Sequence, residues 1–363
     1  MTWVPMNDLS RALAAQKPDL ERVLTAVIDS GWLVHGPQHH AFEEELARYL
    51  GVRHVVGVGN GTDALEIALR SVCPDDRQTI VTTANCGAYT SVADRNAGLR
   101  VRYTDIDPTS HLLDPAALET VLDDSVGVVV VTHLYGRAAD VDAAKALCTP
   151  RGIAVLEDCA QAIGVRTPAG LVGSLASVAT FSFYPTKNLG ALGDGGAIVT
   201  QDDALADRLR AARQYGWEGK YTITLPDGRN SRLDEVQAAV LRHRLTLVDE
   251  TNARRRAIIG RYAAAASERV RVLPADGLEH AAHLAVVETE SAAELIAHLG
   301  RHEVRTDVHY PVPDHRQPAF AAEYADIELP VTDALVGRIV SLPCFPELTR
   351  NEIEQVCDAL ASY

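Results

Sequence analysis

The sequence has no excess of basic residues. Its 34 lysines and arginines are outnumbered by 49 aspartates and glutamates, which gives a formal net charge of -15 at pH 7. Non-specific binding to nucleic acid needs a basic surface, so this charge balance argues against it. A small anionic ligand is not excluded, because a few local cations and backbone amides can bind a phosphate on an acidic protein.

Long apolar runs are also missing. Asp8, Arg11, Lys17 and Asp19 interrupt the first twenty residues, and the most apolar run, 126–131, is too short to span a bilayer. The six cysteines include no C-x-x-C pair, which suits reduced thiols. We therefore expect a cytoplasmic protein without a membrane segment.

The thirteen histidines form no metal-binding pattern. His35, His39 and His40 are close in sequence but lack an accompanying helical set of ligands. We expect these three side chains to be exposed to solvent, and we expect no metal site.

The chain is long enough for a large domain and a smaller one. It has 363 residues, of which 47% are hydrophobic, and 25 glycines, as is typical of a globular enzyme. Amphipathic segments separate short β-branched runs through the first two-thirds, which indicates a mainly parallel sheet covered on both faces. The seven expected strands are 54–58, 79–83, 99–103, 126–132, 153–157, 178–183 and 197–200, and the expected helices include 41–50, 62–71, 115–122, 141–148 and 204–213.

A different pattern follows residue 232. Apolar residues at helical spacing predict a long helical connection from 232 to about 268, and then a smaller α+β region. Its expected strands are 270–273, 283–287 and 304–308, and its last helix is 351–362. We expect a large α/β domain over 1–248, including the N-terminal segment, and a small domain over 249–363.

Lys187 is the most informative single residue. It follows an apolar strand and precedes a glycine-rich turn, Gly193 to Gly196, that leads into another strand. A lysine held in such a constrained loop can form a Schiff base with an aldehyde or a cofactor. Taken alone, the same pattern also fits an ordinary surface lysine.

Three other positions supply matching chemistry. The turn around Gly61 and Thr62 follows a strand and opens a helix, a place that favours a phosphate, although Thr62 could equally be a simple N-cap. Asp158 ends an apolar strand, where α/β sheets bind ligands, and a buried carboxylate there needs a cation such as a pyridinium nitrogen. The alternative for Asp158 is again an N-cap. Ser182 adds a hydroxyl near Lys187, or is only a strand serine.

These features occur in one order along the chain and resemble a known family. Together they are similar to the sugar aminotransferases of the DegT/DnrJ/EryC1/StrS family, which are fold-type I pyridoxal-phosphate enzymes. The resemblance covers nearly the whole chain. Its motifs are 30–37, 42–43, 61–65, 105–107, 133–136, 157–162, 181–190 with 193–196, 230–235, 309–311 and 345–349.

The resemblance implies a fold, a cofactor and a homodimer. The expected fold is that of aspartate aminotransferase, with a seven-stranded, mainly parallel sheet domain and a smaller C-terminal α+β domain. The expected cofactor is pyridoxal 5'-phosphate. Its contacts would be Lys187 as the Schiff-base and proton-transfer residue, Asp158 at the pyridine nitrogen, Gln161 near the ring's phenolic oxygen, Gly61, Thr62 and Ser182 at the phosphate, and Asn230 reaching that phosphate from the partner subunit.

One position departs from the family pattern. Many members have an aromatic residue stacked on the cofactor ring where this sequence has Gly87. Tyr89, two residues later, is a candidate for that contact, with a tyrosine on a helix face as the alternative.

The segment from Thr306 to Pro318 bears on the substrate. It resembles the corresponding segment of enzymes that aminate C-3 of dTDP-3-keto-6-deoxyhexoses. By that similarity His309, Tyr310 and Tyr184 would contact the nucleotide diphosphate, with Lys220 or Tyr221 contributed by the partner subunit. Asp314 is unusual there, because it places an acid near a presumed diphosphate site.

The family also implies ping-pong amino transfer, with L-glutamate as the expected donor, in the biosynthesis of dTDP-amino sugars. Alternative acceptors are a 4-keto nucleotide sugar, a cyclitol ketone or an aminoaromatic precursor. Relatives that dehydrate have histidine in place of the lysine, so Lys187 argues against dehydration. A catalytically inactive regulatory or binding protein on the same fold is the alternative of another class.

Overall fold

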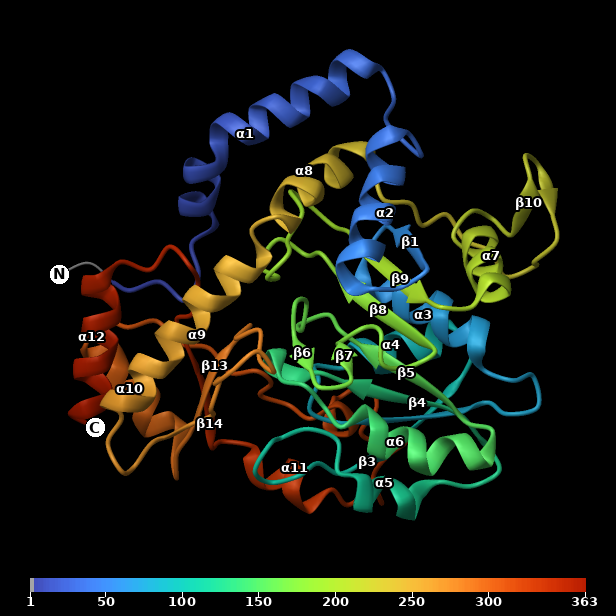
Figure 1. The fold of residues 1–363 in the computed structure, drawn as a ribbon. Helices are drawn as coiled ribbons and strands as arrows, with labels where there is room; N and C mark the ends of the chain where they lie inside the picture. Colours follow the sequence, from blue (N-terminus) through green and yellow to red (C-terminus); the bar gives the residue numbers. More distant parts are fainter. Residues whose placement is uncertain (1–2) are drawn as a thin grey trace.

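The computed structural model describes residues 3–363, and its centre is a seven-stranded sheet (Figure 1). The strand order is β1-β9-β8-β5-β4-β2-β3. β3, β2, β4, β5 and β8 run parallel, while β9 is antiparallel to both β8 and β1. The bounds are β1 His54–Val58, β2 Thr79–Thr83, β3 Arg100–Thr104, β4 Val126–Thr132, β5 Ala154–Asp158, β8 Val178–Ser182 and β9 Gly196–Thr200. All seven predicted strands are confirmed to within one residue at each end.

The sheet forms because its strands are apolar on both faces. Every residue of β4 is buried, and its valines alternate between two cores: Val128 and Val130 pack into one, Val129 and Val131 into another. Helices cover both faces (Figure 1). Those around the sheet are α2 Pro37–Leu50, α3 Gly61–Val72, α4 Tyr89–Asn96, α5 Pro115–Val121, α6 Val141–Cys148 and α7 Asp203–Ala212.

The predicted long helical connection is two helices, α8 Glu235–Leu245 and α9 Val248–Ala265, which meet at Thr246 and Leu247. After α9 come α10 Ala292–Arg301, α11 Pro330–Leu335 and α12 Arg350–Ala361, together with a three-stranded antiparallel sheet of β12 Arg271–Val272, β13 Ala285–Glu288 and β14 Ile339–Leu342. The division into domains 1–248 and 249–363 remains our proposal. In the structure, Val4 packs with the core of the C-terminal part, while Tyr324 and Leu329 pack against the large sheet.

The prediction of a strand at 304–308 was wrong. Val304 makes a single parallel bridge with Val4, and Asp307 makes a single antiparallel bridge with Ser341 of β14. Because the segment divides its pairing between two partners, no continuous ladder forms. The third strand of the small sheet is instead β14, which lies some thirty residues later in the chain.

Helix α1, Leu9–Ser30, precedes these elements and packs against α8 (Figure 1). Asp8 caps it by accepting a hydrogen bond from the Ser10 N–H at 3.1 Å, and Gly31 ends it with φ of 67°. Within residues 3–363 no helix combines the length and the apolar content needed to cross a membrane.

The expected exposure of the three neighbouring histidines was wrong for His39. Its ring is fully buried: Nδ1 lies 3.1 Å from the Leu233 carbonyl, and Nε2 lies 2.9 Å from Glu43 and 3.1 Å from Arg213. The α2 helix turns this residue inward, so that it joins a buried network with an acid and a base. His40 is exposed, and His35 is half-buried.

Candidate active site

A cavity of about 810 Å³ opens at the carboxyl ends of the parallel strands. Thr132, Asp158 and Ser182 end β4, β5 and β8, and all three line it. Ten of the thirteen residues predicted for the site lie in its wall: Gly61, Thr62, Tyr89, Asp158, Gln161, Ser182, Tyr184, Lys187, His309 and Tyr310. The topology thus brings together residues that are far apart in the sequence.

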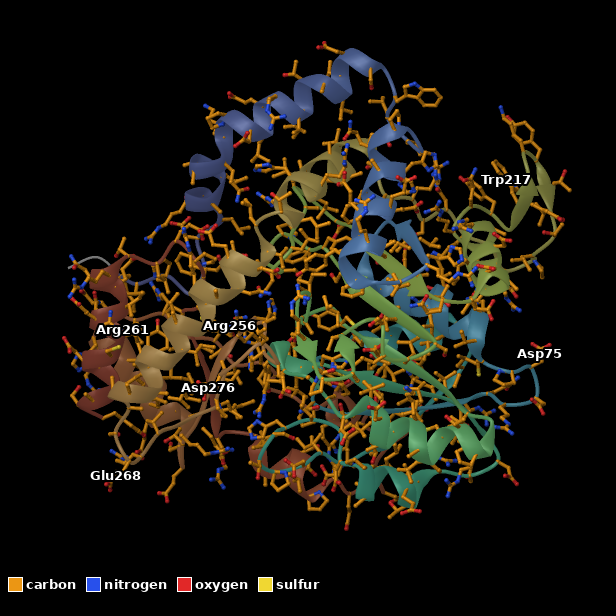
Figure 2. The ribbon with its side chains drawn as sticks, viewed as in Figure 1. Asp75, Trp217, Arg256, Arg261, Glu268 and Asp276 are labelled. Atoms are coloured by element: carbon orange, nitrogen blue, oxygen red, sulfur yellow. The ribbon has the colours of Figure 1, made fainter. Side chains whose placement is uncertain are left out.

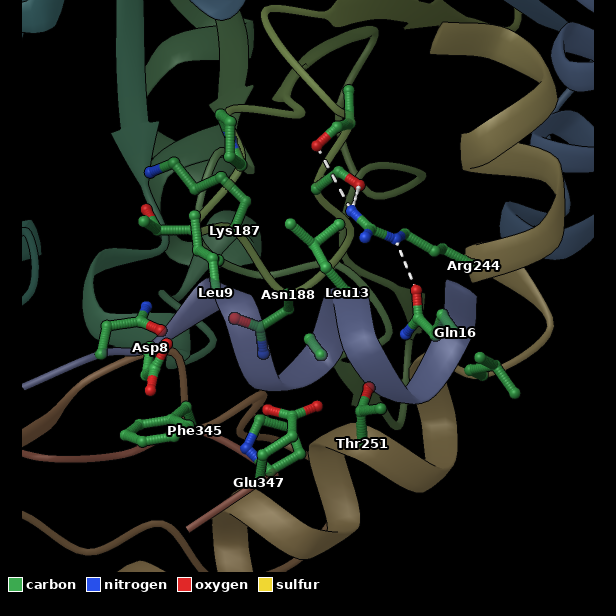
Figure 3. A pocket seen from close by; sticks show the side chains of 18 of the residues that line it. Asp8, Leu9, Leu13, Gln16, Lys187, Asn188, Arg244, Thr251, Phe345 and Glu347 are labelled. Carbon is green, nitrogen blue, oxygen red and sulfur yellow. Dashed lines mark hydrogen bonds between the residues drawn. The ribbon is translucent and has the colours of Figure 1, made fainter. Parts of the chain in front are cut away.

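Lys187 is held by a compact loop between β8 and β9. Its N–H donates to the Tyr184 carbonyl at 2.8 Å, and the Ala191 N–H donates to the Phe183 carbonyl at 2.8 Å. A Cβ on Gly190 would lie 2.5 Å from the Pro185 carbonyl oxygen, so the loop closes only with glycine there. Figure 3 shows this loop from a second, smaller cavity of about 260 Å³ beneath helix α1, which Lys187 also lines.

The Lys187 amine is electrostatically suited to nucleophilic attack. Burial lowers its pKa to about 8, although the nearby Asp158 carboxylate partly opposes this shift. A neutral amine is the form that attacks a carbonyl, so a useful fraction is reactive near neutral pH.

This lowered pKa predicts the pH dependence of cofactor capture. If Lys187 is the residue that captures pyridoxal phosphate, as the sequence resemblance implies, the rate of attachment to the cofactor-free protein should rise as Lys187 loses its proton and should level off above about pH 8. An ordinary lysine, with a pKa of about 10.4, would still be gaining reactivity two units higher. Stopped-flow absorbance across pH 6 to 10 measures the profile. A rate that keeps rising to pH 10 would contradict the assignment.

Asp158 is a buried carboxylate at the end of β5. It is 6% exposed and accepts a hydrogen bond from the Ala160 N–H at 3.0 Å. Burial raises its pKa, while the Ala160 N–H and the charge of Lys187 act in the opposite direction. A buried carboxylate of this kind is stabilised by a cation. A protonated ring nitrogen of a ligand would be such a cation.

The start of α3 forms a close-fitting cradle. Asn60 is the N-cap, and its side chain accepts a hydrogen bond from the Asp63 N–H at 2.8 Å. Thr62 therefore does not cap the helix, which decides against the alternative considered from sequence. A Cβ on Gly61 would lie 2.6 Å from the Ser182 Cβ, so only glycine allows the helix start and the end of β8 to approach this closely.

Filling this cradle should weaken phosphate binding. Gly61→Ala places a methyl group against Ser182. If the cradle holds the phosphate of pyridoxal phosphate, as the sequence resemblance implies, this variant should raise the Kd for that cofactor about tenfold or more, because the helix start must move away from the phosphate. Gly260→Ala is the matched control, since a Cβ there meets nothing within 4 Å. Cofactor titration followed by absorbance measures both variants. Equal Kd values would show that the cradle does not bind the phosphate.

Gln161 is oriented from two sides. Its Oε1 accepts a hydrogen bond from the Tyr135 N–H at 2.7 Å, and its Nε2 donates to the Tyr310 hydroxyl at 3.1 Å. Three buried potential metal ligands, His133, Glu157 and Cys159, also lie close to one another. Glu157 instead accepts hydrogen bonds from the backbone N–H groups of 173, 175 and 176 and lies 3.1 Å from the His133 Nε2. Because hydrogen bonds already engage this carboxylate, the cluster is best explained as structural.

Three predicted residues lie outside the cavity of this chain. Lys220 and Tyr221 lie in the hairpin of β10 Trp217–Gly219 and β11 Thr222–Ile223, which projects beside α7, with Trp217 labelled in Figure 2. Tyr221 is 74% exposed, and Asn230 is exposed where the returning chain bridges to Gln214. This arrangement is compatible with a role in a partner's site, which remains a prediction.

The sequence did not single out every residue that lines the cavity. Asp194 and Arg255 do so as well. Asp194 belongs to the glycine-rich turn after Lys187, so its motif was a usable signal. Arg255 stands in a run of three arginines on α9, and nothing in that run marks the one that is buried.

Asp314 does not line the cavity. Its buried carboxyl turns toward the loop after β2, where Oδ1 accepts a hydrogen bond from the Ala88 N–H at 2.7 Å and Oδ2 lies 3.4 Å from the Ser91 hydroxyl. Burial raises its pKa to about 7. This acid therefore anchors a loop, which removes the difficulty of an acid facing a diphosphate.

Comparison with known proteins agrees with this geometry. The profile of the DegT/DnrJ/EryC1/StrS aminotransferase family matches residues 15–361. The chain is 39% identical to the erythromycin biosynthesis sensory transduction protein EryC1 of Saccharopolyspora erythraea (98% of each chain), and 38% identical to dTDP-3-amino-3,4,6-trideoxy-alpha-D-glucose transaminase of Streptomyces venezuelae (99% of this chain, 96% of the relative). It matches the crystal structure of S. venezuelae DesV in complex with a ketimine intermediate with a TM-score of 0.95 and 36% identity, over 100% and 98% of the two chains. The chain therefore belongs to the DegT/DnrJ/EryC1/StrS aminotransferase family.

Proposed function

We propose that this aminotransferase uses pyridoxal 5'-phosphate to convert a dTDP-3-keto-6-deoxyhexose into the 3-amino sugar, with L-glutamate as the donor. The observation that carries the proposal is the pairing, within one cavity, of a lysine whose pKa is lowered and a buried carboxylate at a strand end. The Streptomyces relative named as a dTDP-3-amino-sugar transaminase supports the C-3 position.

The residues present fit the cofactor. The cradle at Gly61, with Thr62 and Ser182, would hold its phosphate, and the Asp158 carboxylate would hold the proton of its ring nitrogen. Gln161 would stand beside the phenolic oxygen, with its orientation fixed by the Tyr135 N–H. When bound, pyridoxal phosphate supplies an electron sink that stabilises negative charge on the donor's α-carbon.

Lys187 is the proposed general base and general acid of the reaction. Its amine, when not bonded to the cofactor, would remove the α-proton of the donor in the first half-reaction and would deliver a proton to the sugar carbon that gains the amine in the second. The compact loop around it keeps the Nζ inside the cavity through both halves of the reaction. One group thus serves as base and acid in turn.

We also propose a homodimer with shared active sites. The hairpin that carries Lys220 and Tyr221 is exposed and aromatic-rich, with the Trp217 and Tyr221 rings 5.4 Å apart and Ile223 63% exposed. Such an apolar projection is stabilised by burial against a second copy, which would bring Asn230 to the neighbouring phosphate site. His309 and Tyr184 would then approach the nucleotide from the same chain as Lys187.

The test is product identification. Purified protein should be given 3-keto and 4-keto dTDP-sugars, each with L-glutamate, and the aminated products identified by mass spectrometry and NMR. We expect conversion of the 3-keto sugar. Exclusive conversion of the 4-keto sugar would contradict the C-3 assignment while leaving the aminotransferase assignment intact.

A regulatory role is the second candidate, because one relative is named a sensory transduction protein. The two functions differ in colour: a working aminotransferase reconstituted with pyridoxal phosphate is yellow and changes its absorbance when glutamate is added. A protein that stays colourless with added cofactor would favour the regulatory role.

A further inference from the structure

The loop after β2 has no side chain at Gly87, and the ring of Tyr310 packs against the backbone there. Gly87 has φ of +82°, and a Cβ built on it would lie 2.8 Å from Cε1, 2.9 Å from Cζ and 3.0 Å from Cδ1 of Tyr310. The Tyr310 ring therefore occupies the space where a side chain at position 87 would project. Residues 87 and 310 are distant in sequence, yet the Tyr310 ring fits here only because residue 87 has no side chain.

The Tyr310 ring is held in a fixed position. Its hydroxyl accepts a hydrogen bond from Gln161 Nε2 at 3.1 Å, and the hydroxyl of Tyr135 donates to the neighbouring His309 carbonyl at 2.7 Å. Four residues further on, the Asp314 N–H donates to the Ala84 carbonyl at 2.7 Å, and its carboxyl accepts from the Ala88 N–H. Hydrogen bonds thus join the segment 310–314 to the loop that carries Gly87 on both sides of that glycine, at Ala84 and at Ala88.

The fastened ring lines the main cavity. Tyr310, Asp158, Ala160 and Gln161 all line it, and Gln161 joins the ring to the short loop that follows Asp158. A flat ligand with its ring nitrogen at Asp158 and an oxygen beside Gln161 would therefore extend along Tyr310. Aromatic rings bind one another in offset or edge contacts that add to simple burial.

We infer that Tyr310 is the aromatic residue that contacts the cofactor ring, and that Gly87 is the position that makes room for it. This inference rests on the proposed use of pyridoxal phosphate. It reassigns Tyr310, which the sequence placed at the nucleotide diphosphate, to the ring.

Tyr89 is the competing candidate. It also lines the cavity, but it is 53% exposed, and its ring meets Tyr310 edge-on, with the centroids 6.1 Å apart and the planes at 76°. It has no hydrogen bond comparable to the one between Tyr310 and Gln161 among residues 3–363. Tyr89 therefore supports the outer edge of Tyr310.

The test compares Tyr310→Leu, Tyr310→Phe and Tyr89→Leu for cofactor binding. Tyr310→Leu removes the ring and should raise the Kd for pyridoxal phosphate roughly five- to tenfold and change the visible circular dichroism of the bound cofactor. Tyr310→Phe keeps the ring, so its Kd should stay within about twofold of the wild-type value and its visible circular dichroism should be unchanged. Tyr89→Leu should have a smaller effect than Tyr310→Leu. The reverse order, or a Tyr310→Phe variant as weak as Tyr310→Leu, would overturn the inference.

Two further measurements keep the result unambiguous. Thermal unfolding of the cofactor-free variants separates loss of binding from loss of folding, and each Kd is measured at a temperature at which the variant is folded.

Gly87→Ala tests the pairing of Gly87 with Tyr310. It pushes a methyl group against Tyr310, so it should weaken cofactor binding when Tyr310 is present and have less effect in the Tyr310→Leu background. Additive effects would overturn the pairing of Gly87 with Tyr310. A wild-type protein that fails to bind pyridoxal phosphate contradicts the proposed function itself, whereas normal binding by wild type and Tyr310→Leu alike contradicts only this inference.

Discussion

Lys187→Ala should lower kcat by roughly 10⁴-fold or more, because it removes the residue that we propose both holds the cofactor as its nucleophile and moves the α-proton. Cofactor affinity should fall much less, since the cradle at Gly61 and the Asp158 carboxylate remain. Single-turnover absorbance with bound cofactor and glutamate separates the two effects: the variant binds but does not transfer the proton.

The low lysine content makes this prediction easy to check. The chain has only four lysines, Lys17, Lys145, Lys187 and Lys220. Borohydride reduction of the wild-type protein with pyridoxal phosphate should add the cofactor mass to the peptide that contains Lys187. Lys145→Ala is the matched control, because this residue lies on α6 away from both cavities and its amine bonds to the Leu175 carbonyl. Labelling at another lysine, or a Lys187→Ala variant with normal turnover, would contradict the assignment.

The strands of the main sheet were predictable because local sequence determines them. Runs such as 126–132 are apolar on both faces, short and rich in valine, which is typical of a strand covered on both sides. The same logic placed Asp158 at the end of an apolar strand of a mainly parallel sheet, where ligands bind. That the strand ending in Ser182 is its parallel neighbour is a finding of the structure. The tight loop around Lys187 was likewise signalled by glycines whose close contacts the structure now explains.

Other features depend on contacts that local sequence does not encode. The segment 304–308 has the alternation of a strand, but Val4 and Ser341 divide its pairing. The roles of Tyr310 and Asp314 depend on a loop more than two hundred residues earlier, around Gly87 and Ala88. Sequence reasoning could see the missing aromatic at Gly87 but not the ring that fills its space.

Asp158→Asn should lower kcat about 10²- to 10⁴-fold. The amide has nearly the shape of the carboxylate but no charge, so the proton on the cofactor's ring nitrogen loses its partner in a buried site, a loss worth about 3–5 kcal/mol. The effect should fall mainly on proton removal from the donor, because that step places negative charge on the ring. Single-turnover kinetics with α-deuterated glutamate measures it: the isotope effect should grow in the variant as this step becomes limiting.

A second experiment separates the effect of the Asp158 charge from the effect of its shape. A cofactor analogue methylated on the ring nitrogen carries a permanent positive charge and does not need a carboxylate to keep it. Asp158→Ala should therefore be nearly inactive with pyridoxal phosphate and regain a large part of its activity with the analogue, since the smaller side chain also leaves room for the methyl group. Asp123→Asn, at an exposed ion pair with Arg102, is the matched control for removing a carboxylate. An Asp158→Ala variant that the analogue does not improve would show that Asp158 acts by position and not by charge.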